Sequence, residues 1–129
     1  VKALAIYRDG SKTAQALRAL WLVGNEYLQE AAPWTAIKTD RDRAAVIVRT
    51  ALNLAALYAR ISAPFIPFAA EKISEAFAQA WPPTWPSADV AAELSTVPAG
   101  QAVRAPEVLF KKIDDDMIAE WAARFGGAE

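Results

Sequence analysis

The sequence predicts an all-α protein, an antiparallel helix bundle followed by an irregular segment and a short C-terminal helix. Apolar residues recur at steps of three and four over long stretches, and no stretch alternates convincingly at a period of two. Clusters of proline, glycine and aspartate separate those stretches. With 129 residues, 54% of them hydrophobic, the chain has the length of one domain with a single core. We expect one domain, with the main helices in residues 1–86, an irregular crossing segment in 87–113 and the last helix in 114–125.

The first helix is expected to begin near Lys12, after a turn, with Ser11 or Thr13 as its cap. One face of it carries the apolar and small residues that recur at helical steps, Leu17, Trp21, Gly24, Leu28 and Ala31. Glycine inside a helix costs about 1 kcal/mol against alanine, so Gly24 indicates the close approach of a neighbouring helix. Pro33 lacks an N–H group and restricts the residue before it, and the helix should therefore end in a corner at residues 32–34.

The second helix is expected to run from Asp40, its cap, to Ser62 and to be the buried central helix, because apolar residues cover most of its surface. Its polar residues form one narrow stripe, Asp42, Arg49, Asn53 and Arg60. We expect Arg49 and Asn53 to belong to a buried or half-buried polar network. The apolar stretch 44–59 is interrupted by polar residues, and we expect it to be too short and too polar to span a membrane.

Pro64 and Pro67 form a second corner, after which a third helix is expected from about Phe68 to Ala80. Its core face would carry Ile73, Phe77 and Ala80. The proline-rich run 81–86 ends it. Residues 87–106 have no sustained period and should cross the bundle irregularly, with one short helical turn at 88–94. The acidic run 114–116 suits the start of a last helix, 117–125.

Several classes of function are excluded by composition. The chain has no cysteine and no histidine, which rules out a disulfide framework, a Ser-His-Asp triad and a zinc site of the Cys/His kind. Glu71 and Glu75 could form a carboxylate pair, but a solvated helix face explains them better, and the acidic run 114–116 has the chemistry of a helix start. We therefore predict no catalytic and no metal-binding residues. The lack of disulfides fits a cytoplasmic protein, and no membrane partner is expected.

One region is basic although the whole chain has a net charge of −1. Five positive residues, Lys38, Arg41, Arg43, Arg49 and Arg60, outweigh Asp40 and Asp42, which gives 5 − 2 = +3 between residues 38 and 60. Trp34 lies at the edge of this region. Proteins hold unpaired RNA bases with an aromatic ring that stacks on the base and cations that meet the phosphates. A tryptophan beside a proline in a helical bundle is also commonly a core anchor, and the residues alone leave both interpretations open.

The run from Gly24 to Trp34, followed by Lys38, resembles a motif of methionyl-tRNA synthetases, in which Asn-x-Tyr and Ala-Pro-Trp-x-x-x-Lys join two helices of the anticodon-binding domain. The corner at residues 63–67 looks like the second proline corner of that family. The Trp85-bearing loop and the stretch 109–114 are similar to the run that leads to its C-terminal helix. The resemblance covers roughly residues 15–118. Corners of the Ala-Pro-Trp type also occur in related class I synthetases.

The resemblance implies the helical bundle of the class I synthetase anticodon-binding type, which reads the CAU anticodon of the tRNA for methionine. In the family, the tryptophan of this corner stacks on an anticodon base and the proline shapes the same site, which points to Trp34 and Pro33. Asn25, Lys38 and Arg41 are candidates for nearby support. For Asn25 a hydrogen bond between helices is an alternative to a base contact. Two further anticodon readers of the family, an asparagine and an arginine, would precede Val1.

The whole synthetase joins methionine to its tRNA using ATP with magnesium, through a catalytic domain whose HIGH-like and KMSKS-like motifs do not occur here. This chain is therefore expected to bind tRNA, to lack the catalytic domain and to catalyse nothing. Leu109, Phe110, Trp121 and Phe125 could cover a surface that docks on that catalytic domain. Trp21, Trp81 and Trp85 are expected to have packing roles.

Two other functions are compatible with the same features. The chain could be the anticodon-binding domain of another class I synthetase, which would discriminate a different anticodon. It could also be a helical protein-interaction module without RNA binding, which the net negative charge and a buried Trp34 would favour. The exposure of Trp34 separates the second alternative from the RNA-binding interpretations.

Overall fold

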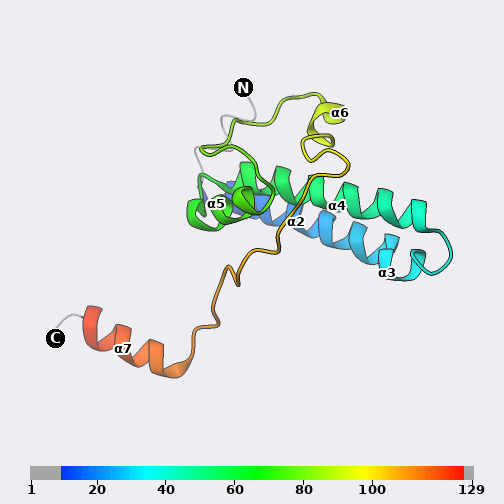
Figure 1. The fold of residues 1–129 in the computed structure, drawn as a ribbon. Coiled ribbons are helices and arrows are strands. Elements are labelled where there is room, and N and C mark those ends of the chain that lie inside the picture. Colours follow the sequence, from blue (N-terminus) through cyan, green and yellow to red (C-terminus); the bar gives the residue numbers. More distant parts are fainter. Residues whose placement is uncertain (1–9, 127–129) are drawn as a thin grey trace.

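The computed structural model describes residues 10–126, and within that range it is all-α, as the sequence predicts. The helices follow in the order α2 (Gly10–Ala31), α3 (Pro33–Ala36), α4 (Arg41–Ser62), α5 (Pro67–Ala76), α6 (Val90–Glu93) and α7 (Asp115–Phe125). Figure 1 shows α2 and α4 as an antiparallel hairpin with α3 at its turn, and α5 against the far end of α4. The segment that carries α6 passes over α4, and an extended linker then leads to α7, away from the bundle (Figure 1).

The α2–α4 hairpin is built on the face of α2 that the sequence predicts. Leu17 is buried, and the indole Nε1 of Trp21 donates a hydrogen bond to the hydroxyl of Ser62, at 3.2 Å. Gly24 lies directly under the ring of Tyr58, so the close helix approach expected at this glycine is confirmed. Burial raises the pKa of the Tyr58 hydroxyl, and a hydrogen bond with the Gly24 backbone partly offsets that rise.

Adding one methyl group at Gly24 should change stability in a way that depends on Tyr58. A Cβ atom there would lie 2.6 Å from Cε2 of Tyr58. Overpacking costs about 1–3 kcal/mol, while the gain in helix propensity is about 1 kcal/mol. We expect Gly24→Ala to destabilise the parent but to stabilise a Tyr58→Leu background, as measured by urea denaturation. The same sign in both backgrounds would contradict this packing.

The cap expected at Asp40 is present, and the acidic start expected for the last helix also supplies a cap. The Asp40 carboxylate accepts a hydrogen bond from the Arg43 N–H at 2.9 Å, and the Asp114 carboxylate accepts one from the Met117 N–H at the same distance. The prediction of Ser11 or Thr13 as the first cap was wrong. Helix α2 already includes Gly10, so both residues lie inside it, and Thr13 is buried. A cap residue must have a non-helical backbone, which neither residue has.

Helix α5 begins at Pro67, close to the predicted start, but ends at Ala76 rather than at Ala80. Ala78 has a positive φ of 51°, the Gln79 N–H donates to the Ser74 carbonyl, and the Ala78 N–H donates to the Glu75 carbonyl. This is the Schellman pattern, which usually places glycine where Ala78 stands. An alanine gives no sequence signal for it. Ala80 is consequently exposed and off the core face, whereas Ile73 and Phe77 pack into the core.

Ala78 should be a position where glycine stabilises the protein. The left-handed conformation costs an L-residue about 1–2 kcal/mol, and the extra freedom of glycine in the unfolded chain removes about 0.4–1 kcal/mol of the benefit. We expect Ala78→Gly to raise the free energy of unfolding by about 0.5–1 kcal/mol. Ala80→Gly, at a position without a positive φ, is the control and should lower it. Loss of stability in both variants would contradict the left-handed turn.

Helix α4 is central, as expected, because it packs against α2, α3 and α5, but it is buried on one side only. Six of its residues are buried, Ala44, Ile47, Asn53, Ala56, Ala59 and Ser62, whereas Val46 and Val48 are exposed. A core cluster of Ala56, Phe77 and Val97 joins α4 to α5 and to the segment after α6. The expectation that this stretch is too short and polar to span a membrane needs correction, because all 22 residues are helical and an 18-residue window has a mean hydropathy of 1.4. Length and composition alone would thus allow a crossing. The helix packs against α2, α3 and α5 and carries the fully buried Asn53, although only 28% of that window is buried.

Candidate nucleic-acid interface

The corner after α2 is shaped by one residue in the left-handed region. Ala32 has φ 42° and ψ 65°, because the following proline disfavours the right-handed helical conformation at this position. Its carbonyl accepts hydrogen bonds from Thr35 and Ala36, which starts α3 at Pro33. The turn places Trp34 on the outside of the bundle with 51% of its surface exposed. The core-anchor interpretation of Trp34 is therefore wrong, and the ring is available to a ligand.

Trp34 lies on a cleft of about 800 Å³, which is within the range of ligand-binding pockets. Two segments far apart in the sequence form it. One side is the α3 corner and the first half of α4, and the other is the loop 97–101. The lining residues are Pro33, Trp34, Ile37, Arg41, Ala44, Ala45, Val46, Val48, Arg49, Leu52, Val97, Pro98, Ala99, Gly100 and Gln101.

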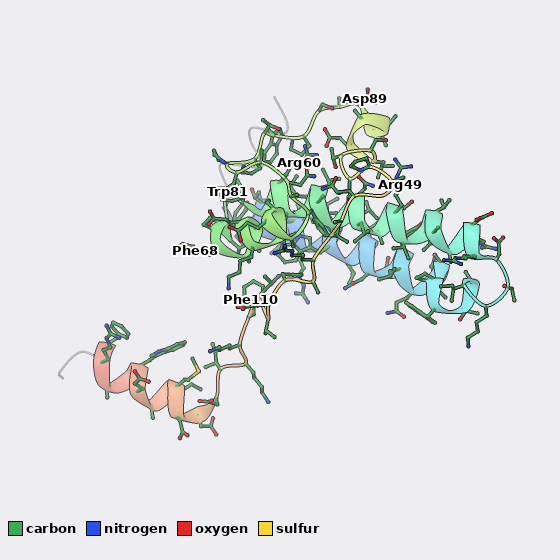
Figure 2. The ribbon with its side chains drawn as sticks, viewed as in Figure 1. Arg49, Arg60, Phe68, Trp81, Asp89 and Phe110 are labelled. Atoms are coloured by element: carbon green, nitrogen blue, oxygen red, sulfur yellow. The ribbon has the colours of Figure 1, made fainter. Side chains whose placement is uncertain are left out.

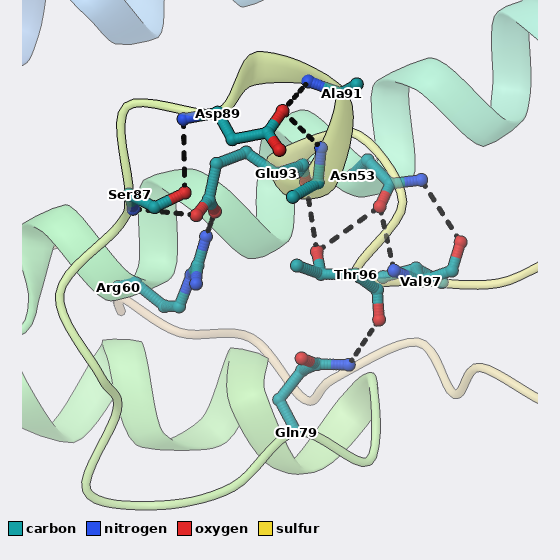
Figure 3. A network of polar contacts seen from close by, with 10 residues as sticks. Asn53, Arg60, Gln79, Ser87, Asp89, Ala91, Glu93, Thr96 and Val97 are labelled. Atoms are coloured by element: carbon teal, nitrogen blue, oxygen red, sulfur yellow. Dashed lines mark hydrogen bonds and ion pairs between the residues drawn. The ribbon is translucent and has the colours of Figure 1, made fainter.

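Asn53 ties the loop to α4. Its side-chain Oδ1 accepts a hydrogen bond from the Val97 N–H at 2.8 Å, and its Nδ2 donates to the Val97 carbonyl at 3.2 Å (Figure 3). The same Nδ2 also donates to the Arg49 carbonyl at 3.0 Å. The Thr96 hydroxyl donates to the same Oδ1 at 3.3 Å. Asn53 is 0% exposed, so every one of these bonds replaces a lost contact with water. The expected buried polar network is confirmed for Asn53.

A second set of contacts holds the segment around α6. Arg60 forms an ion pair with Glu93, whose carboxylate also accepts a hydrogen bond from the Ser87 N–H at 2.7 Å, and Asp89 caps α6 (Figure 3). Burial lowers the pKa of the Arg60 guanidinium from its usual value. Arg60 thus belongs to a structural contact at the far half of α4, and the basic region predicted from the sequence is divided by the fold.

Two arginines bring positive charge to the cleft. Arg41, at the start of α4, and Arg49, two turns later, both line it, and none of the lining residues is acidic. The prediction that Arg49 lies in a buried or half-buried network was wrong. Its side chain is exposed and lines the open cleft, and it forms no ion pair within residues 10–126. Figure 2 shows Arg49 on the side of α4 next to the loop 97–101.

The fold brings together only some of the residues singled out from the sequence. Pro33, Trp34 and Arg41 line one cleft. Lys38 is exposed in the turn after α3 but is not part of the cleft lining. Asn25 lines a separate groove between α2 and α4, and its side chain makes no hydrogen bond to another residue of the described range. The alternative of a hydrogen bond between helices is therefore not seen for Asn25.

The carboxylates singled out from the sequence lie away from the Trp34 cleft. Glu71 and Glu75 lie on α5, outside the cleft, and no three acidic side chains of residues 10–126 come together as metal ligands would. An exposed aromatic ring, two cations and an open cleft are instead the features of a module that binds unpaired nucleotides. The sequence had indicated Trp34 and Arg41. It gave no signal for the loop 97–101, which the contacts of Asn53 and the packing of Val97 against Ala56 hold beside α4.

The class defined by this fold and cleft is thus a helical nucleic-acid-binding module. The family model described as the anticodon binding domain of methionyl tRNA ligase matches residues 6–129. The chain is 83% identical over 118 residues to the methionine–tRNA ligase of Caulobacter sp. (strain K31). The aligned residues cover 92% of this chain and 21% of that protein. It is 53% identical over 132 residues to the methionine–tRNA ligase of Jannaschia sp. (strain CCS1), covering 98% of this chain and 22% of that one.

The chain therefore belongs to the family of methionyl-tRNA ligase anticodon-binding domains. The resemblance seen in residues 15–118 is confirmed, and the match extends beyond it. The chain spans about a fifth of the length of the curated relatives it matches. No solved structure matches it significantly.

Proposed function

We propose that this chain reads the CAU anticodon of the tRNA for methionine, as part of a methionine–tRNA ligase. The observation that carries the proposal is the half-exposed Trp34 on a cleft that also holds Arg41 and Arg49, in a chain of this family. Because Trp34 is exposed, the alternative of a helical protein-interaction module without RNA binding is less favoured. Membership of the methionyl-tRNA ligase family favours this anticodon over that of another class I synthetase.

The mechanism follows from the chemistry of the cleft. An unpaired anticodon base stacks on the Trp34 ring, and Pro33 sets the position of that ring. Arg41 and Arg49, with Lys38 at the nearby turn, meet phosphates of the loop. Stacking of this kind contributes about 1–3 kcal/mol per base but tolerates any base. Selection of CAU therefore requires hydrogen bonds to base edges in addition.

The proposal extends to the longer protein. It would ligate methionine to its tRNA using ATP with magnesium, in a catalytic domain that lies outside this chain, and it would work in the cytoplasm. The residues of the present chain contribute tRNA binding and positioning, and we assign none of them to the ligation reaction. The partners proposed are thus the tRNA for methionine and the catalytic domain, and no membrane.

The test is binding of a CAU anticodon stem-loop and of the same stem-loop with its C replaced by G, at low salt, since contacts to phosphates weaken steeply as salt rises. We expect the CAU loop to bind about 5-fold to 150-fold more tightly, because a mismatched base edge costs about 1–3 kcal/mol. Equal affinity of the full-length protein for the two loops would overturn CAU reading. Tighter binding of the anticodon stem-loop of another tRNA would instead indicate the anticodon-binding domain of another class I synthetase.

We also propose that α7 docks on the remainder of the longer protein through its apolar stripe. Trp121 and Phe125 are 42% and 70% exposed, with Ile118 and the partly buried Met117 on the same helix. The matched relatives are about five times longer, which supplies a surface that could cover this stripe. In the full-length protein, Trp121→Glu should speed proteolytic cleavage of the linker 102–114, because an undocked α7 leaves that linker accessible. Ala123→Glu, a charge added to α7 outside the stripe, is the control, and equal cleavage of both variants would refute docking.

A further inference from the structure

We propose that the loop 97–101 is the second wall of the anticodon cleft and supplies hydrogen bonds to a base edge, and that Asn53 is the positioning residue that holds this wall. The inference rests on the proposed function, and it adds the selective contacts that stacking on Trp34 lacks. It assigns a role in recognition to a segment that lies more than sixty residues from the Trp34 corner in the sequence.

The loop is fixed at both ends. At its start Val97 is buried in the core and bonded through both its N–H and its carbonyl to Asn53. At its end the Gln101 side chain donates a hydrogen bond to the Phe77 carbonyl, and the Arg104 N–H donates to the Ala76 carbonyl at 2.9 Å. A segment anchored in this way presents its backbone groups in fixed positions, which is what selective recognition requires.

Between these anchors the loop has free hydrogen-bonding groups. Its tip is turned by Gly100, which has a positive φ of 81°. The Gln101 N–H donates to the Pro98 carbonyl at 3.3 Å, whereas the N–H groups of Ala99 and Gly100 donate to no other residue within 10–126. Both residues line the cleft and are exposed. Backbone N–H groups at such a position suit the acceptor atoms of a base edge.

Arg49 lies on the α4 side of the same cleft. It is on the helix turn that precedes Asn53, whose Nδ2 bonds to the Arg49 carbonyl. Because its guanidinium forms no ion pair with a residue of the described range, it is available to a phosphate or to the plane of a base. Trp34, Arg49 and the loop thus border one space that can hold a splayed nucleotide.

The first experiment fills the cleft from the loop side in the full-length protein. Ala99→Trp places a bulky ring in the cleft, while Ala102→Trp places one three residues on, at an exposed position that does not line it. We expect Ala99→Trp to weaken binding of the CAU stem-loop at least tenfold and Ala102→Trp to bind like the parent. Arg49→Gln should weaken binding about fivefold to tenfold and reduce the slope of log affinity against log salt by about 1.

The second experiment tests the positioning role of Asn53. Asn53→Leu removes the contacts to Val97, whereas Ser62→Ala removes a partly buried hydrogen bond at the far end of α4. At a temperature where circular dichroism shows both variants folded, we expect the ratio of affinities for the CAU loop and the C-to-G loop to fall about tenfold in Asn53→Leu and to stay unchanged in Ser62→Ala. Loss of stability alone would leave both ratios unchanged. If Asn53→Leu does not fold, the comparison of Ala99→Trp with Ala102→Trp tests the inference instead.

The outcomes separate this inference from the proposed function. If Trp34→Ala weakens binding but Ala99→Trp and Arg49→Gln bind the CAU loop as the parent does, the loop is no part of the site and the inference is overturned while CAU reading stands. If the parent does not prefer the CAU loop, both are overturned. Weakened binding in Ala99→Trp, with normal binding in Ala102→Trp, supports the second wall.

Discussion

Replacing Asn53 by leucine is expected to lower the free energy of unfolding by about 3 kcal/mol, because a buried hydrogen-bonding group left without a partner costs about 1–3 kcal/mol. The leucine is close in volume but can neither donate nor accept. It leaves the N–H and the carbonyl of Val97 unpaired inside the core, together with the Thr96 hydroxyl at its edge. Urea denaturation of the two proteins, followed by circular dichroism, measures the difference.

A matched control lies on the same helix. Thr50→Ala removes a hydrogen bond from the Thr50 hydroxyl to the Val46 carbonyl that is exposed to solvent. Its effect should stay within about 0.5 kcal/mol, as is usual for surface substitutions. If Asn53→Leu changed stability no more than Thr50→Ala, the link between α4 and the segment after α6 would carry little of the stability of the bundle.

Replacing Trp34 by alanine is expected to weaken binding of the CAU stem-loop by about 5-fold to 150-fold, the equivalent of about 1–3 kcal/mol of base stacking. Half of the ring is exposed, and the stability of the bundle should therefore change little. Titration of a labelled stem-loop at low salt, together with a thermal melt of each variant, measures the two effects separately. A loss of affinity with an unchanged melting temperature identifies a ligand contact rather than a structural one.

Phe68 provides the control for removing an exposed aromatic ring. It stands at the start of α5, is 81% exposed and does not line the cleft (Figure 2). Phe68→Ala should bind the stem-loop as the parent does. Equal weakening in both variants would indicate a general loss of apolar surface. Unchanged affinity in Trp34→Ala would remove the stacking platform from the mechanism.

The helices and their main faces were predictable because local rules decide them. The apolar period of α2, the proline corners and the capping aspartates Asp40 and Asp114 each act within a few residues. The end of α5 was not predictable, because the motif that stops it uses Ala78 where glycine is usual. The first cap was misplaced because a serine or threonine near a turn also fits inside a helix, as Ser11 and Thr13 do.

The candidate site was predictable only on one side. Trp34 and Arg41 lie next to the Pro33 corner, and their proximity follows from their short separation along the chain. Whether Trp34 points inwards depends on the left-handed backbone of Ala32, which spacing alone does not reveal. The other side depends on the contact between Asn53 and Val97, 44 residues apart, and no periodicity links such positions. Arg49 was misplaced because its neighbours on the polar stripe, Asn53 and Arg60, are held by contacts with Val97 and Glu93, whereas Arg49 has no such side-chain partner in the described range.

The most direct test of the central claim, that the cleft at Trp34 holds the anticodon, is photocrosslinking. A CAU stem-loop with a photoreactive base at the first anticodon position would be irradiated with the full-length protein, and the attached peptide would be identified by mass spectrometry. We predict attachment within residues 33–41 or 97–101, the two segments that border the cleft outside the body of α4. Attachment confined to α7, or to the exposed α2 residues Leu22 and Val23, would contradict the account.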